Sequence, residues 1–142
     1  MDIKQRYQGF QTLCGVLKDE GCHFLVLCSI AEEYLQKPVD LIGAIRISQS
    51  KGWMRSDFYV KDSIAILEYV TNAKWTRKEV AKLPVIRDND YTEAVYYNAR
   101  TGFRHYRRRG YDTLEHSVTV AEGVIEKYYI YTVGSNDTSS SK

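Results

Sequence analysis

The fold class is decided by SVTVA (117–121) and VIEKYYIYTV (124–133), two segments near the C-terminal end of the chain. Both are rich in β-branched and aromatic residues, which pack well on a pleated, half-buried surface. Between them, Glu122 and Gly123 are typical of a tight hairpin turn. The two segments therefore predict an antiparallel pair of strands.

The residues upstream extend this predicted sheet. EAVYYN (93–98) is rich in β-forming residues, and 103–107 continues as a strand after the turn signal Thr101-Gly102. Arg109-Gly110 marks another turn. Much earlier in the chain, WMRSDFYV (53–60) predicts one more short extended segment.

The first half of the chain predicts helices. Phe10, Leu13, Cys14 and Leu17 recur at the spacing of one helical face, and Gly21 ends that segment. Three more helices are expected: one from Cys22 to about Gln36, one from just after Pro38 to Gly52, and one that Asp62 or Ser63 caps and that contains Ile64, Leu67 and Val70. Helices followed by strands predict an α+β fold, with N-terminal helices packed on a C-terminal antiparallel sheet.

Length and composition predict a single domain. A chain of 142 residues with 44% hydrophobic and 27% charged residues is ordinary for a globular protein with one core. We expect this domain over residues 1–133, followed by a disordered polar tail at 134–142. The most apolar stretch, 24–31, is far shorter than the roughly 20 residues that cross a bilayer, so no membrane span is expected.

The cysteine count bears on the compartment. The first ten residues carry charge and no apolar segment, so no secretory signal is expected. Three cysteines cannot all pair within one chain. An odd count without a signal indicates unpaired thiols in a reducing cytoplasm.

The charge of the chain is uneven. The net charge of +2 implies no general attraction to nucleic acid, but residues 100–110 hold five arginines and no acid. Arg104, Arg107, Arg108 and Arg109 surround a predicted hairpin with tyrosines nearby, so they are candidates for binding an acidic protein or a nucleic acid. A solvated face is the alternative interpretation of the same residues.

Three residues form a candidate catalytic set. Cys22 stands at the expected start of a helix, where the helix dipole and exposed N–H groups stabilise a thiolate. His105 lies in a predicted strand, and Asp112 falls opposite it if residues 107–110 form the turn. Together they supply a nucleophile, a base and a carboxylate that orients the base.

Simpler interpretations stay open for these residues. Cys22 can be a small buried hydrophobe, as we expect for Cys14 and Cys28, and His105 can be an ordinary strand histidine. The chain has no CxxC or HxxxH pair, so no zinc site is expected. Acyl transfer by a thiol needs no metal or organic cofactor, so none is expected.

Four stretches carry a resemblance to known families: GCHFLVLCSIAE (21–32), KGWMRSDFYV (51–60), TGFRHY (101–106) and YDTLEHSVTVAEGVIEKYYIY (111–131). The order of cysteine on a helix, histidine on a strand and aspartate on the next strand resembles the papain-like cysteine peptidases, above all their compact C39-like branch. The chain also resembles a family of short uncharacterised phage and plasmid proteins. The resemblance implies a papain-like fold with Cys22, His105 and Asp112 at the catalytic positions, and a bacterial host cell as the setting.

The chain departs from the peptidase pattern in two places. That pattern has a glutamine about six residues before the cysteine, where its amide helps to form the oxyanion hole, and Val16 stands there instead. The nearest upstream glutamine is Gln11, so backbone N–H groups of Cys22 and His23 are the expected donors. The gap of seven residues from His105 to Asp112 is also short for the group.

Two functions follow from these patterns. The first is a small intracellular thiol hydrolase, a peptidase or amidase that uses Cys22, His105 and Asp112 on a peptide or protein substrate. The alternative is an inactive module of the same fold, a phage accessory protein or host-defence antagonist, that binds its partner through the arginine-rich hairpin.

Overall fold

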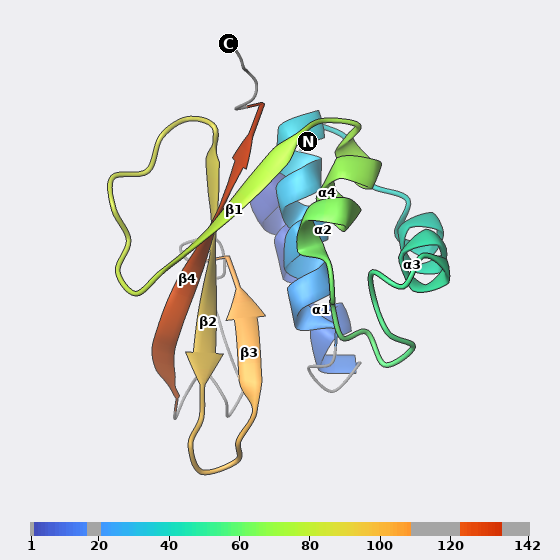
Figure 1. Ribbon diagram of the computed structural model, residues 1–142. Coiled ribbons are helices and arrows are strands. Elements are labelled where there is room, and N and C mark those ends of the chain that lie inside the picture. The colour runs from blue at the N-terminus through green and yellow to red at the C-terminus, as the bar shows by residue number, and fades with distance from the viewer. Residues whose placement is uncertain (1, 17–20, 109–122, 135–142) are drawn as a thin grey trace.

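The computed structural model describes residues 2–16, 21–108 and 123–134. Over these residues the chain forms four helices followed by four strands (Figure 1). The helices are α1 (Ile3–Val16), α2 (Cys22–Leu35), α3 (Leu41–Ser50) and α4 (Ser63–Thr71), and the strands are β1 (Trp75–Val80), β2 (Asp90–Tyr97), β3 (Arg104–Arg107) and β4 (Val124–Val133). The expected α+β class, with helices before strands, is confirmed.

Local side-chain chemistry sets several helix ends. The Asp40 carboxylate accepts a hydrogen bond from the Gly43 N–H at 3.1 Å and so caps the start of α3. At the start of α4, the Asp62 carboxylate accepts from the Ala65 N–H at 3.0 Å, which resolves the two candidate caps in favour of Asp62. Helix α2 ends where Gln36 adopts a left-handed conformation with φ of 56°.

The strands form one antiparallel sheet in the order β1-β4-β2-β3. Strand β4 has the bounds expected from its sequence, and it lies between β1 and β2. Strands β2 and β3 form a hairpin whose turn includes Gly102, at a φ of +76° that favours glycine. The expected strand at 117–121 lies outside the described residues.

One expectation about strands was wrong, and one strand was not anticipated. Residues 75–80 form β1, although no strand was expected there; four of the six residues are exposed, so the segment lacks an apolar pattern. Residues 53–60 form a loop rather than an extended segment. A single antiparallel bridge between Met54 and Val60 joins the two ends of this loop.

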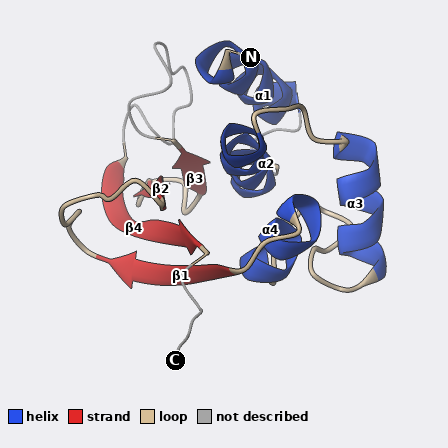
Figure 2. Ribbon diagram, turned by 90° about the horizontal axis from the view of Figure 1, so that it is seen from above, coloured by secondary structure: helices blue, strands red, loops and turns tan. Residues whose placement is uncertain are grey.

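Helix α2 lies at the centre of the core. All four helices lie on one side of the sheet, and α2 packs against α1, α4 and β3 (Figure 2). The helix is therefore buried almost without a break from Phe24 to Glu32. Full burial of a side chain such as Leu27 or Ile30 contributes roughly 1.5–3 kcal/mol.

A buried carboxylate joins the helices. Glu32 is 1% exposed and accepts two hydrogen bonds from the Arg6 guanidinium, at 2.5 and 2.7 Å. It also accepts from the Val39 N–H at 2.9 Å, so one side chain connects α1, α2 and the chain that leads into α3. Among the described helices, none combines the length and the apolar character needed to cross a membrane.

Candidate functional site

The start of α2 places Cys22 in a helix N-terminus. Cys22 is the first residue of α2, and Gly21 before it provides no side-chain cap. The first-turn N–H groups of a helix have no partners within the helix, and with the helix dipole they favour a negative charge beside them. This is the local environment that the sequence predicted for a reactive sulfur.

His105 lies against this sulfur. It comes from β3, opposite Tyr96 of β2, and its Nδ1 atom is 3.4 Å from the Cys22 Sγ. Both residues are buried, at 3% exposure for Cys22 and 4% for His105. The fold thus brings together two residues that are 83 positions apart in the sequence. Asp112 lies outside the described residues.

A third residue reaches the same place from α1. The sulfur of Cys14 is joined to that of Cys22 in a disulfide, with their Cα atoms 5.2 Å apart. The expectation of three unpaired thiols is therefore wrong for two of them, because α1 packs on α2 and brings its last turn beside the start of α2. Cys28 is unpaired and buried, and desolvation, followed by the nearby Glu32 charge, raises the pKa of its thiol.

The two sulfurs and the imidazole are also of the type that binds a transition metal. One ligand atom from each of Cys14, Cys22 and His105 lies within 4.8 Å of the others, although their sequence spacing fits no zinc pattern. Structural zinc takes four ligands, and a thiolate is needed from each cysteine. The disulfide leaves neither sulfur as a thiolate, so this state does not suit a metal ion.

A very small cavity adjoins the sulfurs. It has a volume of about 10 Å³, and Gln11 of α1 lines it together with Cys22 and His105. A volume of that size is close to the least that holds one water molecule. The peptidase spacing had suggested no glutamine here; Gln11 reaches the cavity because it lies three residues before Cys14, on the same face of α1.

The arginines of the expected binding hairpin are largely engaged within the chain. Arg104 makes two hydrogen bonds to the Glu126 carboxylate, both at 2.9 Å, and Arg107 lies over the Tyr96 ring at 5.5 Å. Arg109 lies outside the described residues.

Arg108 is a correction to the sequence interpretation, because it is only 4% exposed and does not face solvent. Its guanidinium donates to Glu33 at 2.6 Å and to Ser29 at 3.2 Å, both on α2. Its backbone N–H donates to the Tyr7 hydroxyl of α1 at 2.8 Å. The residue therefore attaches the end of β3 to two helices.

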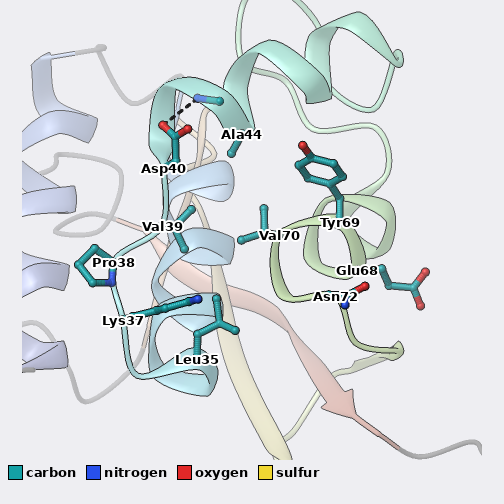
Figure 3. A pocket seen from close by; sticks show the side chains of 11 residues that line it. Leu35, Lys37, Pro38, Val39, Asp40, Ala44, Glu68, Tyr69, Val70 and Asn72 are labelled. Atoms are coloured by element: carbon teal, nitrogen blue, oxygen red, sulfur yellow. Dashed lines mark hydrogen bonds between the residues drawn. The ribbon is translucent and has the colours of Figure 1, made fainter.

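A larger cavity lies away from the sulfurs. It has a volume of about 540 Å³ and is formed by the end of α2, by α3 and by α4 (Figure 3). Its carboxylates have structural partners: Asp40 caps α3, and Glu68 accepts from the Trp75 N–H at 3.1 Å. The side chains of Val39 and Val70 point into the space between the helices.

Comparisons with known proteins add no relative to this description. No family model, no curated protein and no solved structure matches the chain.

Proposed function

We propose that the chain is a small thiol hydrolase of papain-like architecture that acts by acyl transfer on an amide bond of a peptide or protein. The observation that carries this proposal is the 3.4 Å contact between the Cys22 Sγ and the His105 Nδ1 at the start of a helix. A nucleophilic sulfur needs both a base within reach and an environment that favours the thiolate. Both are present at this one position.

The reaction divides into two transfers. His105 takes the proton from the Cys22 thiol, and the thiolate attacks the carbonyl carbon of the amide. His105 returns the proton to the leaving amine, which leaves an acyl group on the sulfur as a thioester. His105 then removes a proton from water, which attacks the thioester and releases the acid. In this proposal Asp112 orients His105, and the Cys22 backbone N–H with the Gln11 amide stabilises the oxyanion.

The disulfide makes the proposed activity depend on reduction. A sulfur bonded to Cys14 cannot attack a carbonyl, and the 10 Å³ cavity leaves no room for an amide beside it. We therefore propose that the oxidised form is inactive. A dithiol reductant gives up two electrons and two protons to yield the Cys14 and Cys22 thiols and becomes a disulfide itself. A bacterial cytoplasm supplies such reductants, which suits the proposed setting.

The proposal is tested by alkylation of the folded protein with iodoacetamide, measured for each cysteine by mass spectrometry across pH. After mild reduction, Cys22 is expected to label rapidly well below pH 8, and His105→Ala is expected to shift that labelling towards the ordinary thiol pKa of about 8.5. Cys28→Ala is the matched control, since this cysteine is buried and outside the disulfide. Slow labelling of reduced Cys22 at pH 7, with no change in His105→Ala, would refute the proposal.

A non-catalytic binding module is the second candidate, and the burial of the Cys22–His105 pair favours it. In that case the reduced thiol does not label rapidly, and Cys22→Ala leaves partner binding unchanged. Arg104, with a side chain 46% exposed, then becomes the first arginine to substitute, because Arg108 is buried. Binding to an acidic protein or nucleic acid through the hairpin should weaken steeply with salt.

A further inference from the structure

A third cavity lies beside the start of α2, separate from the sulfurs, and has a polar lining. It has a volume of about 270 Å³, and it lies between α2, the loop at 58–61 and the sheet. Its lining combines three nitrogen-bearing side chains with four aromatic rings and one valine: His23, Lys61, Arg77, Phe58, Tyr59, Tyr106, Tyr129 and Val60. Of these residues only Tyr106 also lines the cavity at the sulfurs.

A buried carboxylate holds His23 at the edge of this cavity. Glu93 is fully buried, and its two oxygens contact the His23 Nδ1 at 2.6 Å and the Tyr131 hydroxyl at 3.0 Å. The carboxylate holds the His23 ring through its Nδ1 atom, so the ring cannot turn without breaking a buried contact. The Nε2 atom is the other ring nitrogen and takes no part in this contact.

Two cations face the same space from other elements. Arg77 of β1 lies over the Tyr129 ring, with its Cζ 4.5 Å from the ring centre, and its Nη1 donates to the Ser63 hydroxyl at 3.4 Å. Lys61 comes from the loop before α4. Three nitrogen-bearing side chains therefore line the cavity, and its lining residues include no carboxylate. Such a set favours an anion.

The rings give the cavity flat walls. Tyr106 stacks on His23 with ring centres 4.4 Å apart and an angle of 24° between planes. Burial raises the pKa of Tyr106 to about 12, so its hydroxyl stays neutral and does not repel an anion. Phe58 adopts a φ of 69°, a conformation that costs a non-glycine residue free energy and is concentrated at functional sites.

We propose that this cavity binds a small ligand that carries a phosphate group on a planar ring, with the phosphate at Arg77 and Lys61 and the ring against the tyrosines. A phosphate matches the guanidinium geometry, and a ring matches the tyrosine faces. The volume lies just below the roughly 300–1,000 Å³ of pockets for drug-sized ligands, which restricts the ligand to a small one. This binding requires no chemistry at the sulfurs.

Phenyl phosphate is the probe, and calorimetric titration of the whole protein at low salt measures its affinity. We expect saturable binding with one site, and Arg77→Gln is expected to weaken it about tenfold or more, because a charge-assisted contact is lost. Arg46→Gln is the matched control, since Arg46 is exposed on α3 and the charge change is the same. Glutamine at position 77 keeps a donor for Ser63, and a far-ultraviolet spectrum checks that the variant folds.

Two further titrations divide the ligand into its parts. Phenol lacks the phosphate and inorganic phosphate lacks the ring, so each is expected to bind more weakly than phenyl phosphate. The proposal is overturned if phenyl phosphate shows no saturable binding, if Arg77→Gln and Arg46→Gln bind it equally, or if phenol binds as tightly as phenyl phosphate. The proposal is also overturned if inorganic phosphate binds as tightly as phenyl phosphate, because the ring then contributes nothing to binding.

Discussion

Replacement of Arg108 with methionine tests whether this residue holds the fold together or faces a partner. Methionine keeps much of the volume of the side chain and removes the charge. The substitution deletes the donors to Glu33 and Ser29, while the backbone N–H contact with Tyr7 can remain. Ser29 is 1% exposed, so its hydroxyl loses a partner in a place that water does not reach.

The expected loss follows from these two contacts. A hydrogen bond that involves a charged group contributes about 1.5–3 kcal/mol, and a buried polar group without a partner costs about 1–3 kcal/mol. Glu33 has a side chain 28% exposed, so water recovers part of its loss. We therefore expect Arg108→Met to lower the free energy of unfolding by about 2–4 kcal/mol.

Urea denaturation followed by circular dichroism measures this difference, and Arg104→Met is the matched control. Arg104 pairs with Glu126, but the two side chains are 46% and 32% exposed. A solvated pair of this kind contributes about 0–1 kcal/mol. If the two variants lose the same free energy of unfolding, or if Arg108→Met loses none, then Arg108 does not anchor β3 to the helices.

Three further predictions concern the cysteines and one helix end. Reduction of the Cys14–Cys22 disulfide, which spans eight positions, should lower the free energy of unfolding by about 2.5 kcal/mol on the loop-closure model; urea midpoints with and without reductant measure it, and equal midpoints would contradict it. Cys28 should resist iodoacetamide in the folded protein even at pH 9, because its raised pKa keeps the thiolate scarce, and it should label rapidly in urea. Rapid labelling of Cys28 in the folded protein would contradict this prediction. Gln36→Gly should raise the free energy of unfolding by about 0.5–1 kcal/mol, because glycine adopts the left-handed conformation without the strain of a side chain. A lower urea midpoint would show that the lost hydrogen bond from the Gln36 side-chain amide to the Glu33 carbonyl outweighs this gain.

The predictable parts of the fold are those in which local chemistry and packing agree. Strand β4 has β-branched or aromatic residues along most of its length, and its bounds follow from the sequence. Helix α2 is apolar enough to be buried. Its ends, at Gly21 and Gln36, agree with the helix that the sequence predicted from Cys22 to about Gln36. Strand β1 could not be predicted, because four of its residues are exposed and it has no alternation of apolar and polar residues. It forms because its backbone pairs with that of β4.

The site was predictable only in part, and the reason is tertiary packing. The helix start at Cys22 and the strand at His105 are local features, so their chemistry could be proposed from the sequence. Cys14 lies in the same site because α1 packs on α2. The spacing of residues in the sequence does not predict this packing. Glu93 lies within a β-rich segment like many exposed acids, and only the pairing of β2 between β4 and β3 buries it against His23.

The two cavities share their backbone, and this couples the two proposals. Cys22 and His23 point about 100° apart at the start of α2, and each lines a different cavity. His105 and Tyr106 are consecutive in β3, where side chains alternate in direction, and Tyr106 lines both cavities. A ligand that stiffens the His23–Tyr106 stack therefore also holds the peptide units that carry Cys22 and His105. Phenyl phosphate should therefore change the alkylation rate of reduced Cys22, and Arg77→Gln should abolish that change. An alkylation rate that stays the same at saturating phenyl phosphate would mean that the shared backbone is already rigid and that the two cavities act independently.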